Sequence, residues 1–376
     1  MKVYADHAAT TKLDIEAFEA MKPYLLNEFG NASQPYSFSR TAKAALRSAR
    51  IAIAECINAE PDEIYFTSGG TESDNWAIKG TVLVRGEYRR TITSSIEHHA
   101  LLHACSAVER LGYPVTYIAP DHEGVVQPVS LSGALTPDTK IISIMYANNE
   151  VGSIQPIKEL CTIAHSQGCL FHTDAVQTVG HIPIDVKDLN VDMLSASAHK
   201  FGGPKGIGFL FIKNGVSILP YADGGSQENG LRAGTENVAG IVGMAIALKN
   251  SCKRMEEAAI RLKEYEGVLI KLLNSAGIDF VLNGSANRLP GNLSLSFKNT
   301  DGETLLHRLD LLGVSVSTGS ACDSVNTQVS HVLKAMNLPI QYAKGTIRVS
   351  LGYENTADEV EYIATSLIKT LHRLGE

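Results

Sequence analysis

One lysine of this chain lies in surroundings suited to covalent chemistry. Lys200 ends the segment Ser197–Lys200, and a Gly/Pro-rich turn follows it directly. A carboxylate and an amide, Asp174 and Gln177, lie shortly upstream. A deprotonated lysine amine can condense with an aldehyde, and a carboxylate can keep a pyridine nitrogen protonated. Together with the nearby hydroxyl groups, these residues predict a site for pyridoxal phosphate, although a lone lysine beside a glycine turn would be an ordinary surface residue.

A glycine turn earlier in the chain offers a place for the phosphate. Residues 66–73 have the pattern of a strand, a Gly-Gly turn and a helix start. Free N–H groups at a helix N-terminus attract phosphate, Gly70 lets the backbone approach, and the Thr71 hydroxyl can add a bond. Taken alone, the segment would equally suit an ordinary N-cap. It matches neither the Walker A nor the dinucleotide fingerprint, which argues against ATP and dinucleotides.

One cysteine has the surroundings of a nucleophile. Cys322 lies in a small, polar, glycine-bearing segment, which predicts an exposed and flexible loop where a thiol can react. Asp323 next to it opposes thiolate formation, so we expect activation from the substrate complex or from His98. No Cys-x-x-Cys pair occurs, so we expect neither a zinc ribbon nor a disulfide framework. The other five cysteines are predicted to be small core residues: Cys56, Cys105, Cys161, Cys169 and Cys252.

Composition narrows the class of protein. The 376 residues are 44% hydrophobic and 19% charged, which favours a globular chain of two domains, or one domain with an appendage. The net charge of -7 and the lack of a basic stripe argue against nucleic acid as a direct partner. No apolar run reaches the ~20 residues that span a bilayer, and the first residues lack a signal-peptide pattern. We therefore expect a cytoplasmic protein with no membrane partner.

Apolar runs alternate with helical patterns from about residue 63 to residue 213. This alternation predicts an α/β fold with a mainly parallel, seven-stranded sheet, and ligands bind at the strand ends of such sheets. The predicted helices include 71–84, 100–111 and 157–167. The predicted strands are 63–67, 91–94, 115–118, 141–146, 170–173, 193–195 and 208–212.

A second, smaller unit follows a long helical stretch that runs from Glu236 to about Leu273. We expect this smaller α+β unit to contain residues 256–376 together with 1–14, and the large cofactor-binding domain to contain residues 15–255. Its predicted elements are strands 280–282, 293–297 and 346–351, a helix at 303–312 and a final helix from 357.

Further motifs extend over nearly the whole chain and, in this order and spacing, are very specific. With them the chain resembles a cysteine desulfurase of the NifS/IscS type, a class-V aminotransferase within the fold-type-I pyridoxal phosphate-dependent transferases. The motifs are Tyr4–Thr11, Gly69–Asn75, Glu97-His98, Asn148–Gly152, Asp174–Gln177, Ser197–Lys200, Gly230–Thr235, Ser317–Cys322 and Ile347–Gly352.

The resemblance implies a role for each matching residue. Lys200 binds the cofactor covalently, Asp174 pairs with its pyridinium nitrogen, and Gln177 hydrogen-bonds its phenolic oxygen. His98 stacks on the ring and moves protons, as suits a side chain with a pKa of ~6.5. Cys322 is the nucleophile that accepts sulfur. The implied phosphate ligands are Gly70, Thr71, Ser197 and His199, together with Thr235 from a second subunit. The implied ligands of the substrate carboxylate are Asn149 and Arg348. Asn149 would also contact the cofactor.

The resemblance also implies an activity and partners. The expected reaction converts L-cysteine to L-alanine and leaves a persulfide on Cys322, in a homodimer. The sulfur then passes to an acceptor protein, either a NifU/IscU-like scaffold for iron–sulfur clusters or, second, a thiolation enzyme. No metal site is implied. Three alternatives stay open: a selenocysteine lyase, an aminotransferase of the same fold, and a non-catalytic scaffold that binds partners.

Overall fold

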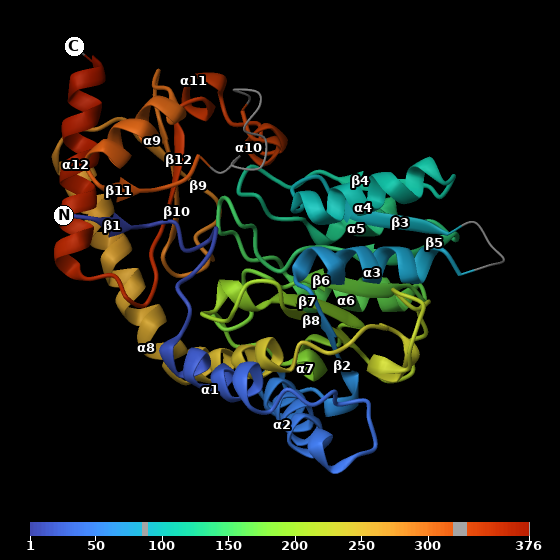
Figure 1. Cartoon of the computed structure of the whole chain (residues 1–376). Coiled ribbons are helices and arrows are strands. Elements are labelled where there is room, and N and C mark those ends of the chain that lie inside the picture. The colour runs from blue at the N-terminus through green and yellow to red at the C-terminus, as the bar shows by residue number, and fades with distance from the viewer. Residues whose placement is uncertain (85–88, 319–328, 376) are drawn as a thin grey trace.

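A mainly parallel sheet of seven strands forms the centre of the larger part of the molecule (Figure 1). The computed structural model describes residues 1–84, 89–318 and 329–375. β8 is antiparallel to both of its neighbours, and the other four strand pairs are parallel, as predicted. The strand order is β2 (Ile64–Thr67), β8 (Gly208–Ile212), β7 (Met193–Ser197), β6 (Leu170–Asp174), β5 (Thr139–Ser143), β3 (Arg90–Ser94) and β4 (Val115–Ile118).

Helices cover both faces of this sheet, because successive side chains of a strand point to opposite faces. Ile141 packs in the core beneath α3 (Gly70–Val82) and α4 (His99–Arg110). The next residue, Ile142, packs in the core on the opposite face. That second core includes α2 (Arg40–Ile57), α5 (Pro128–Ala134), α6 (Ile157–Ser166), α7 (Val186–Leu189) and the first half of α8 (Val238–Ser275). α1 (Ile15–Leu26) begins at the N-cap Asp14 and packs on α8.

The remaining elements form a smaller α+β unit with a core of its own. α8 belongs to both parts, since Leu248 packs in the large core and Leu262 in the small one. The two cores support the predicted division near residue 255, which stays a prediction. The elements are an antiparallel sheet of β12 (Thr346–Ser350), β10 (Asn292–Phe297) and β9 (Phe280–Asn283), the pair β1 (Val3–Tyr4) and β11 (Val314–Ser315), and helices α9 (Gly302–Leu311), α11 (Ile340–Ala343) and α12 (Ala357–Gly375).

A short helix of the C-terminal region packs on the large part. α10 (His331–Ala335) contributes Val332 and Leu333 to a small apolar cluster with Ile96 and Val151. Ile96 follows β3, and Val151 lies in the segment after β5. Residues 316–318 therefore follow β11, and residues 329–330 lead into α10 beside the large sheet; residues 319–328 between them lie outside the described residues.

The predicted strand at 141–146 ends earlier than expected, at Ser143. Beyond it, Ile144 N–H still donates to His172 O on β6, at 3.2 Å. The next amide, Met145 N–H, is taken by both carboxyl oxygens of Glu97, at 3.0 Å each. The Glu97 side chain thus takes an amide on the edge of the chain that faces away from β6, while Tyr146 N–H still donates to Asp174 O on β6 at 2.8 Å. An alternation of apolar residues cannot reveal such a side-chain partner.

Two leucines of α9 offer a direct test of the small core. Leu309 is fully buried, whereas Leu311 on the same helix is 86% exposed. We predict that Leu309→Ala lowers the free energy of unfolding by about 2–5 kcal/mol, because it removes buried methyl groups and leaves a cavity. Leu311→Ala is the matched control and should change it by less than about 0.5 kcal/mol. Chemical denaturation followed by circular dichroism measures both, and equal effects would contradict the assigned core.

Candidate active site

The candidate catalytic side chains lie at one edge of the large sheet, where several parallel strands end. β6 ends at Asp174, and β7 ends at Ser197 and leads through a short 3₁₀ turn (Ala198–Lys200) to Lys200. His98 follows β3 and begins α4. The carboxyl ends of neighbouring parallel strands converge, so these residues from distant parts of the sequence come together.

The Lys200 amine is held by the N-terminal segment. Its Nζ donates to Ala8 O at 2.7 Å and to Ala9 O at 2.8 Å. Gln177 Nε2 donates to the same Ala8 O, at 3.0 Å. His181 Nε2 lies 2.8 Å from the backbone carbonyl of Lys200. Hydrogen bonds therefore fix both the backbone carbonyl and the side-chain amine of Lys200, which sets the position of the amine at the sheet edge.

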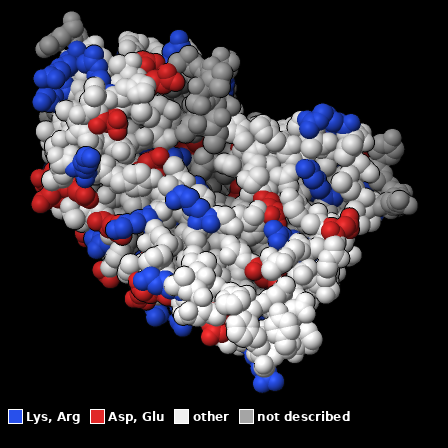
Figure 2. Space-filling model, viewed as in Figure 1, with Lys and Arg blue, Asp and Glu red and all other residues white. Residues whose placement is uncertain are grey.

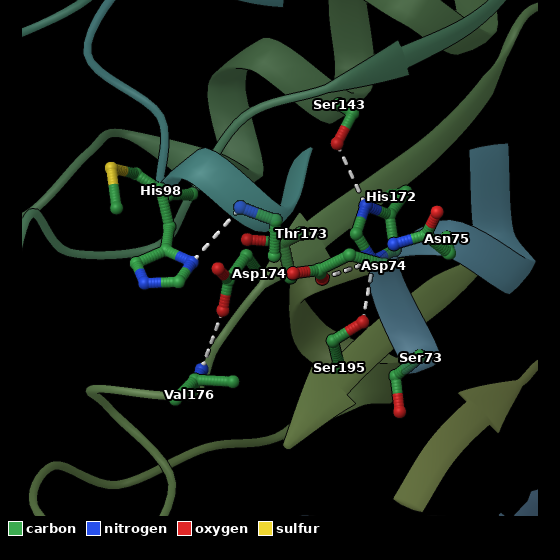
Figure 3. Close-up of polar contacts among 12 residues, drawn as sticks. Ser73, Asp74, Asn75, His98, Ser143, His172, Thr173, Asp174, Val176 and Ser195 are labelled. Atoms are coloured by element: carbon green, nitrogen blue, oxygen red, sulfur yellow. Dashed lines mark hydrogen bonds and ion pairs between the residues drawn. The ribbon is translucent and has the colours of Figure 1, made fainter. Parts of the chain in front are cut away.

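Asp174 (Figure 3) is a buried carboxylate that interacts electrostatically with this amine. Its Oδ1 accepts a hydrogen bond from Val176 N–H, in the turn after β6, at 2.9 Å. Burial raises the pKa of Asp174 to about 6, against the opposing effects of the Val176 amide and the Lys200 ammonium. Asp174 is therefore mainly ionised at neutral pH and can keep a ring nitrogen protonated.

His98 is the N-cap of α4, and its ring is neutral. The ring Nδ1 accepts from Ala100 N–H at 3.2 Å, which assigns the remaining ring proton to Nε2. Burial first, and the Lys200 charge second, lower the pKa of His98 to about 4. The capping bond thus orients a neutral imidazole with one N–H donor at the edge of the site.

A second layer of buried polar groups lies beneath Asp174 (Figure 3). His172, two residues earlier on β6, points to the same face and pairs with Ser143 Oγ at 2.7 Å and Ser195 Oγ at 2.9 Å. Burial lowers the pKa of His172 to about 3, so the ring is neutral. Asp74 of α3 lies 3.8 Å from His172 Nε2, and its pKa is raised well above the usual value by burial and then by Asp174.

Glu97 is a third buried carboxyl near the site. It accepts hydrogen bonds from Ser94 Oγ at 2.5 Å and from Met145 N–H. Burial nevertheless raises its pKa to about 8. Glu97 therefore keeps its proton at neutral pH, burial favours the protonated form of Asp74, and the negative charge of this group of carboxyls lies mainly on Asp174.

The glycine turn predicted as the phosphate end lies directly before α3. Gly69 has a φ of 145°, and a Cβ on Gly70 would lie 2.6 Å from Val176 Cγ2, so both positions require glycine. The first N–H groups of α3 have no acceptor within the helix. Thr71 is exposed here, and the Ser197 hydroxyl lies close to Gly69.

The other two residues assigned to the phosphate, His199 and Thr235, lie in different surroundings. His199 Nδ1 pairs with Thr10 Oγ1 at 3.1 Å, and burial lowers the pKa of His199 to about 4. Thr235 is exposed before α8 and lines a cavity of about 160 Å³ together with Thr67 and Ser68. An exposed Thr235 is available to another chain.

Arg348 of β12 is clamped at the same edge by two partners. Its Nη2 donates to Asp6 Oδ1 at 2.7 Å and its Nη1 to Asn149 O at 2.8 Å. Its buried Nε has no hydrogen-bond partner among the described residues. The guanidinium is thus fixed in its plane, with donor capacity left for a carboxylate.

Sequence reasoning missed several groups of this site. Asp6 and Asp74 lie within the motifs and His172 lies just before one, yet none of them has a predicted role, and only the alternation of β6 could have placed His172 below Asp174. The backbone carbonyls that hold Lys200 carry no sequence signal. Cys322 lies within 319–328, outside the described residues. Over the described part of the chain, no helix is long and apolar enough to cross a membrane, and no cluster of three or more His, Cys, Asp or Glu suits a metal ion.

Known proteins resemble this chain over its whole length. Residues 3–363 match the family described as aminotransferase class-V. Cysteine desulfurase IscS of Dictyoglomus turgidum is 50% identical over 99% of this chain and 95% of its own length. Cysteine desulfurase IscS of Methanosarcina thermophila is 46% identical over 99% of this chain and 92% of its own length.

Solved structures agree. A NifS-like protein superimposes with a TM-score of 0.93 and 38% identity, over 99% of this chain and 100% of that one. The structure described as SspA in complex with cysteine superimposes with a TM-score of 0.83 and 36% identity, and the match covers 93% of this chain and 98% of that one. The chain therefore belongs to the class-V aminotransferase family and, within it, to the NifS- and IscS-type cysteine desulfurases. The predicted family and fold class are confirmed.

The buried Glu97 predicts a dependence of stability on pH. Its pKa is about 8 in the folded protein, against an ordinary value of 4.5, so the folded state keeps a proton that the unfolded state loses. This contribution is complete below the unfolded value and is lost as the pH rises toward about 8. We predict that, as the pH rises through this range, the free energy of unfolding falls less for Glu97→Gln than for the wild type.

Denaturation at a series of pH values measures this difference. Glu55→Gln, at an exposed position of α2, is the control and should follow the wild type. Parallel pH profiles of Glu97→Gln and wild type would show that Glu97 is ionised in the folded protein.

Proposed function

We propose that this enzyme is a pyridoxal phosphate-dependent cysteine desulfurase that converts L-cysteine to L-alanine and leaves a persulfide on Cys322. The observation that carries the proposal is the meeting of Lys200 and Asp174 at one sheet edge, where the lysine charge lowers the pKa of the aspartate. A cation-forming amine beside a buried carboxylate is the pair that this cofactor requires. Relatives named cysteine desulfurase support the choice of substrate.

The side chains of the site fit the cofactor. Lys200 would bind it covalently, Asp174 would face its ring nitrogen, and the neutral His98 ring would stack on it. The crowded Gly70 backbone and the start of α3 would hold its phosphate. Gln177, Ser197, His199 and Asn149 are the further ligands that we propose. When bound, the cofactor supplies an electron sink that stabilises negative charge on the substrate carbon.

Lys200 is the proposed base of the reaction. The carbonyls of Ala8 and Ala9 orient its amine, and once deprotonated this amine can take the proton from the substrate α-carbon. Arg348 is the proposed ligand of the substrate carboxylate, because Asp6 and Asn149 O already fix the plane of its guanidinium. Substrate binding and proton removal are thus assigned to groups from both parts of the molecule.

Cys322 is the proposed sulfur acceptor. Its thiolate attacks the substrate sulfur, so that an S–S bond forms while the C–S bond breaks. The electron pair of the C–S bond stays with the carbon skeleton, which takes up a proton and leaves as alanine. The proton can come from Lys200, which holds the one removed from the α-carbon, while the neutral His98 ring, fixed by Ala100 N–H, can donate a hydrogen bond through Nε2–H at this edge.

The covalent site has a direct test. We predict that borohydride reduction fixes the cofactor to the peptide that contains Lys200, and that Lys200→Ala yields no such adduct. Lys205→Ala is the matched control and should retain the adduct at Lys200. Peptide mass spectrometry reads the position, and an adduct on Lys205 in the wild type would overturn the assignment.

We also propose that the active unit is a homodimer. Large apolar side chains are exposed along α1 and the segment before α2, among them Leu26 (71%), Phe29 (71%) and Phe38 (53%). Figure 2 shows a broad uncharged area at this end of the molecule, whereas charges of both signs are interspersed elsewhere on the face drawn. A second copy would cover this surface and bring its exposed Thr235 to the phosphate end.

Mixed dimers test the shared site. We predict that equal mixing and reassembly of Lys200→Ala and Thr235→Val subunits restores activity that neither has alone. The expected level is about a quarter of the wild type, since half of random dimers are mixed and each has one intact site. A fully active monomer in light scattering would refute the dimer.

The sulfur must leave the enzyme on a partner. We propose an acceptor protein, with an iron–sulfur scaffold of the NifU/IscU kind first and a thiolation enzyme second, in the cytoplasm. The name IscS of several relatives supports this order. Passage of labelled persulfide sulfur to a scaffold, faster than to free dithiothreitol at equal concentration, tests it; a faster transfer to a thiolation enzyme would reverse the order.

A further inference from the structure

Two of the five cysteines predicted as core residues are half-buried instead. Cys56 on α2 and Cys252 on α8 are partly exposed, whereas Cys105, Cys161 and Cys169 are buried. Both half-buried residues pack at the margin of the large core. The sequence pattern did not separate them, because each extends an apolar helix face by one turn.

The two cysteines continue the contact between α2 and α8, which pack on each other. Cys56 lies one turn beyond Ile53, and Cys252 one turn beyond Leu248, and both apolar residues are fully buried in the same core. Residues three or four positions apart lie on one face of a helix. The cysteines therefore lie where the shared interface of α2 and α8 reaches the surface.

The two helices can approach closely at this interface. α2 buries Ala49, two turns before Cys56, and α8 buries Ala245, two turns before Cys252, both with small side chains. Small residues shorten the distance between packed helix backbones. The thiols of Cys56 and Cys252 are accordingly hydrogen-bond partners of each other.

The hydrogen bond divides the roles of the two thiols. Donation from Cys56 lowers the pKa of Cys252, against the opposing effect of burial. The same bond, followed by burial, raises the pKa of Cys56. Cys252 is thus the more acidic thiol and the better first nucleophile, with a second thiol held beside it.

We propose that Cys56 and Cys252 form a reversible disulfide that links α2 to α8, a site of thiol modification separate from the sulfur chemistry of Lys200 and Cys322. The oxidant is a low-molecular-weight disulfide such as oxidised glutathione. Cys252 thiolate attacks one of its sulfur atoms and releases one thiol. Cys56 loses its proton, attacks Cys252 in the mixed disulfide and releases the second thiol. Two protein thiols are oxidised, and one small disulfide is reduced.

The position of the link gives it a structural consequence. Cys252 lies on α8 between Leu248, in the large core, and Leu262, in the small core. A covalent bond to α2 attaches α8 to the large part at the point where the helix leaves it. The oxidised protein should therefore resist denaturation of its large part more strongly than the reduced protein.

Oxidation with glutathione tests the site. Native Cys322→Ser protein, which removes the loop thiol, is incubated with oxidised glutathione, alkylated and digested. The expected product is a peptide pair joined through Cys56 and Cys252, which dithiothreitol separates again. Cys56→Ser and Cys252→Ser should each abolish the pair, and Cys105→Ser, at a buried position, should retain it.

Two results would overturn the proposal. One is a stable glutathione adduct on Cys252 with no cross-linked pair, which would mean that Cys56 cannot reach it. The other is unmodified Cys56 and Cys252 in the native protein when the urea-unfolded chain reacts under the same conditions. A raised midpoint of denaturation in the oxidised protein, absent in Cys56→Ser with an unchanged circular dichroism spectrum, would support it independently.

Discussion

The burial of one charged carboxylate is the constraint on which the site depends. Asp174 is almost inaccessible to solvent, and its charge is favoured by the Val176 amide and by Lys200. The neighbouring groups contribute by staying neutral. Glu97 keeps its proton, His172 stays unprotonated, and burial favours the protonated form of Asp74, because burial opposes a charge on each of them. The field at the ring nitrogen of the proposed cofactor then arises mainly from Asp174.

The N-terminal segment connects this charge to the rest of the site. Asp6 clamps Arg348, the carbonyls of Ala8 and Ala9 hold Lys200, and Thr11 donates to His199 O at 2.9 Å. The same segment begins with β1, which packs in the small core. A displacement of the small part relative to the large sheet would therefore shift the lysine and the arginine together. Such coupling suits a reaction whose groups come from both parts.

The sequence predicted those features that have local or family signals. The parallel sheet followed from alternating apolar runs, and Lys200, Asp174 and Arg348 followed from their motifs. Groups that act through tertiary contacts escaped prediction. The pairing of Arg348 with Asp6 joins residues at opposite ends of the chain, and the bond from Met145 N–H to the Glu97 side chain has no periodic pattern. The half-buried Cys56 and Cys252 resemble core residues in sequence because the helix faces they extend are apolar.

The most direct test of the account is a single turnover of the purified, cofactor-loaded wild type with L-cysteine, in the absence of added thiols. The account predicts one alanine for each active site and one additional sulfur atom on the peptide that contains Cys322, found together by amino-acid analysis and mass spectrometry. Alanine without sulfur on that peptide would contradict the role of Cys322. Transfer of the amino group to a keto acid, with no alanine formed from cysteine, would contradict the desulfurase itself.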